Sequence, residues 1–248
     1  MSGNVTLKGN ERLDELHRNG YRIIQDPNRF CFGIDAVLLG AFAKNSPEDK
    51  VLDIGTGTGV IPILMEARYR GHDYIGLEIQ EDVADMARRS VAFNNLTDRI
   101  VIENVDVKDA LSLYKPGSFD VITTNPPYIK ENDGLINPND TKALSRHELR
   151  VTLEDVVRIS SKLLKNKGKF YMIHRPSRLM EIMSVMREYN LEVKRLRTVH
   201  SYVDKEASMV LIEALRDGGA FMKVEKPLII YDSDGKYMEE VGEIYYGE

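Results

Sequence analysis

Cysteine and long apolar segments are what this 248-residue sequence has least of. Its single cysteine, Cys31, excludes a disulfide bond within the chain and favours a reducing compartment. No apolar run approaches the roughly 20 residues that cross a bilayer, and the polar N-terminal segment lacks the apolar stretch of a signal peptide. No Cys and His residues cluster with metal-ligand spacing. We therefore expect a cytoplasmic protein that has neither a membrane segment nor a metal site.

The net charge of −5 disfavours a polyanionic partner, but the charges are distributed unevenly. Residues 150–200 carry twelve Lys or Arg and five Asp or Glu, whereas residues 201–248 carry five and eleven. We call the first group the basic band; it includes Arg158, Lys162, Lys165, Lys167, Lys169, Arg175, Arg178, Lys194, Arg195 and Arg197. Clustered positive charge can steer a nucleic acid, and an ordinary solvated surface is the alternative.

From residue 50 onward, short β-branched segments alternate with amphipathic segments of helical period. The pattern predicts strands at 50–54, 73–79, 99–106, 119–125, 169–174, 191–200 and 207–216, and helices at 58–70, 81–96, 153–168 and 177–190. This alternation indicates an α/β fold with a mostly parallel sheet and helices on both faces. The last two strands are joined by a short link, so we expect them to pair antiparallel.

The segment before residue 50 is less clearly patterned. Residues 11–25 are compatible with a helix or a hairpin, and residues 32–44 predict a helix capped by Asp35 or by the preceding Gly33–Ile34. We expect residues 1–49 to form a cap on the sheet, and residues 50–248 to form the core of a single domain.

The stretch "VLDIGTGTG" (51–59) lies between a predicted strand and a predicted helix. Glycines at such a turn allow close backbone approach and positive φ, and ligands of open α/β sheets bind beyond the carboxyl ends of the strands. A dinucleotide-binding G-x-G-x-x-G is excluded because Val60 stands where its third glycine belongs. A P-loop is excluded because no Gly-Lys-Ser/Thr follows.

Acidic residues end the next two strands, and Asn-Pro-Pro-Tyr ends the fourth. Glu78 has two acceptor oxygens, which suit vicinal ribose hydroxyls, and Asp106 follows the third strand. The adjacent prolines of "FDVITTNPPYIK" (119–130) end the strand and stiffen the backbone.

The G-x-G-x-G loop with Asp53 resembles motif I of class I S-adenosylmethionine-dependent methyltransferases, and Asn-Pro-Pro-Tyr resembles motif IV of the amino-methyltransferases. The resemblance implies a Rossmann-like fold with a seven-stranded, mostly parallel sheet whose last strand is antiparallel, and S-adenosylmethionine as the cofactor. The cofactor positions that it implies are Gly33, Asp35, Asp53, Gly55, Thr56, Gly57, Gly59, Glu78, Ile79, Asp106, Val107 and Asn125. The catalytic positions are Asn125, Pro126, Pro127 and Tyr128.

The side chains and carbonyls of Asn-Pro-Pro-Tyr suit a planar amine as the methyl acceptor. The Asn125 amide oxygen and the Pro126 carbonyl can each accept an N–H of the acceptor, which orients the amine and stabilises it as a nucleophile. Tyr128 can stack on the face of an extruded base. The sulfonium is a good leaving group, so positioning supplies most of the rate.

Motif IV alone leaves several acceptors open: adenine N6 in DNA or RNA, guanine N2 in RNA, and the glutamine side chain of release factors. Segments such as "NGYRIIQDPNRFCFGIDAVLLGAFA" and "SRHELRVTLEDVVR" resemble the bacterial tRNA1(Val) (adenine-37-N6)-methyltransferase family. That resemblance implies tRNA as the partner and needs no additional protein. We expect Tyr128, Arg146, His147, Lys165, Lys167, Arg175 and Arg178 to contact it, with Arg12, Arg18 and Arg22 adding to the basic band. His174 and His200 are expected to be structural, and the acidic net charge departs from what a tRNA enzyme suggests.

Overall fold

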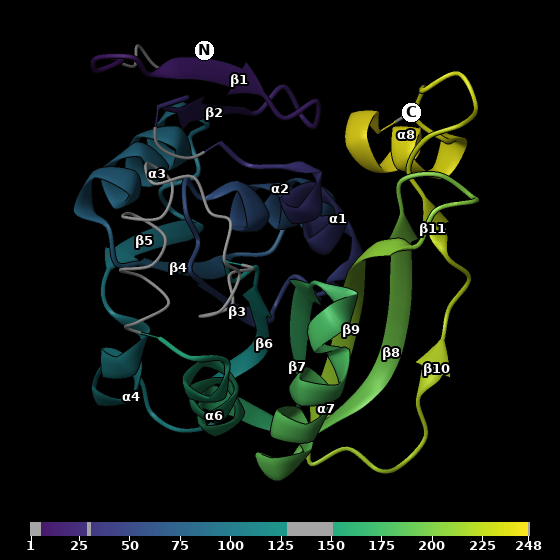
Figure 1. Ribbon diagram of the computed structural model, residues 1–248. Helices are drawn as coiled ribbons and strands as arrows, with labels where there is room; N and C mark the ends of the chain where they lie inside the picture. The colour runs from purple at the N-terminus through teal and green to yellow at the C-terminus, as the bar shows by residue number, and fades with distance from the viewer. Residues whose placement is uncertain (1–5, 29–30, 128–150, 248) are drawn as a thin grey trace.

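A twisted sheet with helices on both faces forms the body of the protein in the computed structural model (Figure 1). The structure describes residues 6–28, 31–127 and 151–247. In these residues the main sheet has nine strands, in the order β10-β8-β9-β7-β6-β3-β4-β5, with β11 also paired to β8. The strands are β3 (Lys50–Ile54), β4 (Asp73–Glu78), β5 (Ile100–Asn104), β6 (Phe119–Thr124), β7 (Leu164–His174), β8 (Leu191–His200), β9 (Ala207–Arg216), β10 (Lys223–Val224) and β11 (Leu228–Ile229).

Strands β5, β4, β3, β6 and β7 run parallel, and β9 is antiparallel to both of its neighbours, β7 and β8. The predicted seven-stranded, mostly parallel arrangement with an antiparallel last strand is confirmed. The two-residue strands β10 and β11 extend it at the β8 edge. Sequence reasoning missed them because two residues carry no periodicity.

Helices cover both faces because successive residues of each central strand point to opposite sides. Val51 and Val121 pack into one core with α1 (Ile34–Phe42), α2 (Val60–Tyr69) and part of α3 (Glu81–Phe93). Leu52 and Ile122 pack into the other core with α4 (Ala110–Leu113), α6 (Leu153–Leu163) and α7 (Leu179–Glu188). Since both faces are buried, the central strands are apolar throughout rather than alternating.

The N-terminal segment forms a hairpin, which decides between the two alternatives for residues 11–25. Strands β1 (Arg12–Glu15) and β2 (Arg22–Gln25) pair antiparallel, and Ile24 of β2 packs against Val83 and Met86 of α3. At the other end of the chain, α8 (Glu239–Tyr246) packs on α1. Figure 1 shows the hairpin and α8 on the same side of the sheet.

One local prediction needs correction, and one pair of alternatives is decided. The helix predicted to end at Gly168 ends at Leu163, because the buried Leu164 adopts an extended conformation and pairs with Phe119 of β6. Helix α1 begins after Gly33 as its N-cap, which agrees with the Gly33–Ile34 alternative, and Asp35 lies in its first turn.

Candidate active site

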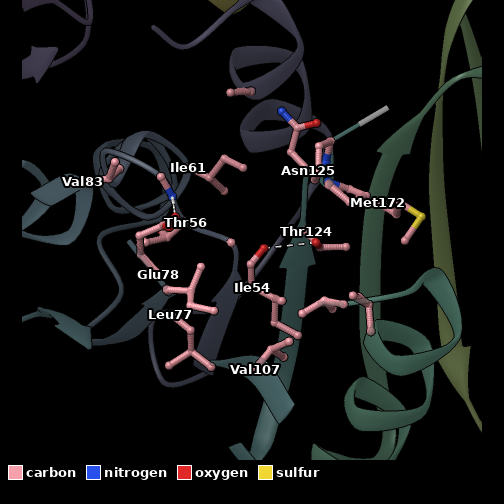
Figure 2. Close-up of a pocket in the computed structure, with 18 of the residues that line it drawn as sticks. Ile54, Thr56, Ile61, Leu77, Glu78, Val83, Val107, Thr124, Asn125 and Met172 are labelled. Atoms are coloured by element: carbon pink, nitrogen blue, oxygen red, sulfur yellow. Dashed lines mark hydrogen bonds between the residues drawn. The ribbon is translucent and has the colours of Figure 1, made fainter. Parts of the chain in front are cut away.

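A cavity of about 420 Å³ opens at the carboxyl ends of the parallel strands. The loop after β3 contributes Gly55, Thr56 and Gly57 to its lining. Figure 2 shows Thr56, Leu77, Glu78 and Val83 on one side, Asn125 and Met172 on the other, and Ile54 and Val107 between them. We call the first side the cofactor half and the second the acceptor half. This is the position where ligands of doubly wound sheets bind.

The glycine loop after β3 requires its glycines. Gly55, Gly57 and Gly59 have φ of +70°, +57° and +86°, which L side chains adopt only at a cost. Gly55 and Gly57 line the cavity together with Thr56, whose N–H donates to the Leu77 carbonyl at 2.9 Å. Gly59 lies behind the cavity and serves as the N-cap of α2.

Glu78, at the end of β4, links the glycine loop to the next turn. Its carboxylate accepts the Gly57 N–H at 3.0 Å and the Gln80 N–H at 2.9 Å. The Asn104 amide donates to the carbonyls of Glu78 and Ile79, both at 2.9 Å, and so joins the ends of β5 and β4. Glu78 is buried but lines the cavity, so its carboxylate is held in a fixed orientation at the wall.

Asp53 lies beneath the glycine loop rather than on the cavity surface. It is only 1% exposed, and the Thr123 hydroxyl donates to its Oδ1 at 2.6 Å. Burial raises the pKa of the Asp53 carboxyl to about 7, and the charge of Glu78 acts in the same direction, while the Thr123 hydrogen bond opposes them. Asp53 is therefore not part of the cavity lining, and its contribution to the cofactor site stays a prediction.

The loop after β5 completes the cofactor half. Asp106 and Val107 both line the cavity, as does Ile79. The Asp106 side chain caps the short 3-10 helix η1 (Val107–Asp109) by accepting the Lys108 N–H at 3.0 Å.

In the acceptor half, Asn125 contacts Asp35 across 90 residues of sequence. The Asn125 amide nitrogen donates to Asp35 Oδ2 at 3.0 Å, and both side chains line the cavity. With the nitrogen assigned as the donor by this contact, the amide oxygen is the acceptor end of the group. A Cβ on Gly33 would stand 2.7 Å from Asp35 Oδ1, so the glycine leaves room for the Asp35 carboxylate.

The cavity wall beyond Pro126 and Pro127 contains residues whose role the sequence did not indicate. Met172 and His174 of β7 line it, and so does Phe32. His174 is 1% exposed, and its Nδ1 accepts the Arg175 N–H at 2.8 Å. Burial and the charge of Arg178 lower the pKa of the His174 imidazole to about 4, so the ring stays neutral at physiological pH. For Met172 and His174, the position at the end of a parallel strand was the available signal.

The residues expected at the substrate are scattered. Arg178 lines the cavity and pairs with Glu181 at 2.7 Å, whereas Arg175 does not line it. Lys165 and Lys167 lie at the opposite end of β7, where they bind Asp120 and the Asp217 carbonyl. Lys165 and Lys167 therefore lie outside the cavity lining, and their expected contact with tRNA stays a prediction. Tyr128, Arg146 and His147 lie outside the described residues.

Several residues of the basic band form ion pairs. Arg158 pairs with Asp155, Arg195 with Glu213 and Arg197 with Glu240. Outside the band, Arg12 and Arg22 also pair with acids, and Arg18 donates to carbonyls of α8. These contacts offset part of the positive charge, and the expected role of the band at tRNA stays a prediction.

The described residues contain no group of three or more His, Cys, Asp or Glu that could hold a metal ion. Among these same ranges, no helix combines the length and apolarity needed to cross a bilayer.

The sheet order and the position of the cavity define a Rossmann-like methyltransferase of class I. Solved structures agree: one from Agrobacterium tumefaciens, described as "a predicted O-methyltransferase", superposes with a TM-score of 0.69 at 21% identity, covering 86% of this chain and 96% of that one. The geranyl diphosphate C-methyltransferase of Streptomyces coelicolor, solved with S-adenosyl-L-homocysteine, superposes with a TM-score of 0.54 at 16% identity. The match covers 74% of this chain and 77% of that one. At these identities the likeness concerns the fold.

Sequence comparison identifies the family. The methyltransferase small domain model matches residues 21–203, and the chain belongs to this family. A Porphyromonas gingivalis protein named tRNA1(Val) (adenine(37)-N6)-methyltransferase is 33% identical over 216 residues, 84% of each chain. A Bacteroides thetaiotaomicron protein of the same name is 34% identical over 164 residues, 66% of this chain and 67% of that one.

Proposed function

We propose that this protein transfers a methyl group from S-adenosylmethionine to the exocyclic N6 of an adenine in tRNA, at the position named for its relatives, adenine 37 of tRNA1(Val). The observation that carries the proposal is the pair Asp35–Asn125 at the rim of a cavity whose opposite wall is the glycine loop and Glu78. The names of the relatives support the acceptor. Since tRNA is its substrate, the enzyme acts in the cytoplasm.

The cofactor half fits S-adenosylmethionine in its chemistry. Glu78 presents a fixed carboxylate for two ribose hydroxyls, and Asp106 presents another for an adenine amine. Ile79 and Val107 supply apolar surface for the adenine ring, and the glycine loop allows close approach of the backbone. The bound cofactor supplies an electrophilic methyl group on a sulfonium.

The acceptor half fits a planar amine. Asp35 holds the Asn125 nitrogen, so the amide oxygen is directed to accept an N–H of the incoming amine. The Pro126 carbonyl offers a second acceptor, and the two prolines limit backbone motion. Fixing the amine before reaction removes an entropic cost and concentrates electron density on its nitrogen.

No strong base is required of this chain. The neutral amine loses its proton only after it has gained the methyl group, when it is strongly acidic. His174 is neutral and lines the acceptor half together with the two prolines. We infer that it contributes to the shape of this half without adding charge.

The test is methylation of a defined RNA. The purified protein is incubated with methyl-labelled S-adenosylmethionine and tRNA1(Val) transcript, and the nucleosides are analysed by mass spectrometry. N6-methyladenosine should form with adenine at position 37 and be lost when that adenine is replaced by guanine. Equal labelling of both transcripts would refute the site, and labelling of neither would refute the acceptor.

A further inference from the structure

Six rings form a continuous strip on the surface formed by the C-terminal segment and the hairpin turn. In order they are Tyr202, Tyr231, Tyr237, Tyr245, Tyr246 and His17, and we call them the aromatic strip. Neighbouring ring centroids lie 5.1 to 5.6 Å apart, and Tyr231 and Tyr237 are stacked with 15° between their planes. Such spacing is that of directly interacting aromatic rings.

The aromatic strip begins at the same edge of the sheet as the cavity. Tyr202 follows the carboxyl end of β8, and Tyr231 follows β11, which runs parallel to β8. Strand β8 points in the same direction as β6 and β7, because each of β7 and β8 is antiparallel to β9. In Figure 1, α8, which carries Tyr245 and Tyr246, lies near the turn of the hairpin that carries His17.

A second cavity lies beside the strip. It is lined by Arg12, His17, Gln25, Cys31, Phe32 and Tyr245, among others. Phe32 also lines the main cavity, as does Asp35. Tyr245 and His17 of the strip therefore share a lining residue, Phe32, with the main cavity.

Three rings of the strip pack against the core and two tyrosines are exposed. Tyr231, Tyr237 and Tyr245 pack against the buried core, whereas Tyr202 and Tyr246 are 37% and 45% exposed. Aromatic side chains that are already ordered lose little conformational entropy when a partner stacks on them. The strip is thus a preformed surface on which Tyr202 and Tyr246 are accessible.

The strip itself offers aromatic surface for stacking. Residues of both charges lie beside its rings, with Asp232 and Glu239 on one hand and Lys205 and Lys236 on the other. Stacking of bases on aromatic rings tolerates any base sequence, because every base has a π face.

We propose that the aromatic strip binds unpaired nucleotides that flank the target base of the RNA substrate. The inference rests on the proposed function for the nature of the substrate, and it adds a second contact surface outside the cavity. Each exposed ring that stacks on one base should tighten binding about 5-fold to 100-fold.

The experiment uses an RNA stem–loop in which 2-aminopurine replaces one loop nucleotide beside the target adenine, because its fluorescence is quenched when it stacks. Titration with wild-type protein should quench the fluorescence, and Tyr202→Leu and Tyr246→Leu should reduce the quenching and raise Kd at least 5-fold. Tyr202→Phe and Tyr246→Phe, which keep the ring, should behave as wild type. Phe221→Leu is the matched control, since Phe221 is 91% exposed but is not in the strip.

Three readouts separate this inference from the proposed function. Thermal melting shows whether each variant is folded, S-adenosylmethionine binding should be unchanged in all of them, and methyl transfer by the Leu variants should show a raised KM for RNA with little change in kcat. Unchanged Kd and quenching in both folded Leu variants would overturn the inference even if the wild type methylates the RNA. Absence of methyl transfer by a wild type that binds RNA through these rings would overturn the proposed function alone.

Discussion

The cofactor half and the acceptor half of the cavity are built in different ways. In the cofactor half, Glu78 and the glycine loop are joined over 21 residues, and the contacts are made largely to backbone groups at neighbouring strand ends. In the acceptor half, Asn125 depends on Asp35, which lies 90 residues away on the first helix. Local sequence therefore specifies the first half, whereas the folded chain as a whole assembles the second.

This difference implies that a substitution in one half should impair either cofactor binding or methyl transfer, but not both. Changes in the cofactor half should weaken cofactor binding and leave the transfer step nearly intact at saturation. Changes at Asn125 or Asp35 should do the reverse, because their hydrogen bond lies on the other side of the cavity. A variant that loses both cofactor affinity and kcat would indicate that the two halves are coupled.

The largest effect is expected from Asn125→Ala. Loss of the amide oxygen removes one of two acceptors for the amine, so kcat for RNA should fall about 100-fold or more. The affinity for S-adenosylmethionine, measured by calorimetry, should change less than about threefold. Asn166→Ala, an exposed site at the far end of β7, is the control. If cofactor affinity falls in parallel with kcat, Asn125 is architectural rather than catalytic.

Glu78→Ala tests the cofactor half, where the expected loss is in cofactor affinity rather than in kcat. It removes the acceptor for the Gly57 and Gln80 N–H groups and the carboxylate offered to the ribose, so Kd for S-adenosylmethionine should rise about 10-fold to 50-fold. At saturating cofactor, kcat should stay within about threefold of wild type. Glu81→Ala, three residues away with its side chain 70% exposed, should bind normally. A large loss of kcat at saturation would contradict the separation of the halves.

Asp35→Ala tests whether Asp35 acts through Asn125. Without this acceptor the Asn125 amide loses the hydrogen bond that orients its nitrogen, and kcat should fall about 10-fold. Asp35→Asn, which keeps a side-chain oxygen for the same hydrogen bond, should recover most of the activity. The double variant Asp35→Ala/Asn125→Ala should be no slower than Asn125→Ala, because the two residues then form one unit. Independent, multiplying losses would show that Asp35 contributes by another route.

The two halves also differ in how well the sequence predicted them. Gly55, Gly57, Glu78 and Asp106 follow apolar strands, so the parallel sheet necessarily brings them to one edge, and the structure places all four at the cavity. No pattern in the sequence linked Asp35 to Asn125, because that contact depends on where α1 packs. Their joint presence at the cavity was expected only from the family resemblance.

The surface charge and the bounds of some strands were the features that the sequence predicted least well. The basic band left a nucleic-acid surface and an ordinary solvated surface open, because ion pairs such as Arg197–Glu240 join residues 43 apart and could not be seen in the sequence. The extended start of β7 was predicted as helix, since "KLLKNKG" (162–168) has good helix formers and its pairing with β6 is a tertiary effect. The aromatic strip was missed because its rings come from separate segments.

The smallest predicted effect is a pH dependence of stability with opposite signs in the two halves. Asp53 has a folded-state pKa raised to about 7, so its contribution is full below pH 4 and is lost as pH rises through 7. His174 has a pKa lowered to about 4, so its contribution is full above pH 6.5 and is lost as pH falls toward 4. Between pH 7 and pH 6 the contributions of Asp53 and His174 to the free energy of unfolding each change by roughly 1 kcal/mol. The two changes have opposite signs and nearly cancel.

Two variants separate these terms. In Asp53→Asn only the His174 term remains, so the free energy of unfolding, measured in urea, should fall from pH 7 to pH 6. In His174→Asn, where the amide oxygen replaces Nδ1 as the acceptor for the Arg175 N–H, only the Asp53 term remains and stability should rise over the same interval. Matching slopes in the two variants would mean that these groups do not titrate as their burial implies. Opposite slopes would show that Asp53, beneath the cofactor half, is largely protonated at pH 6, while His174, in the acceptor half, stays neutral.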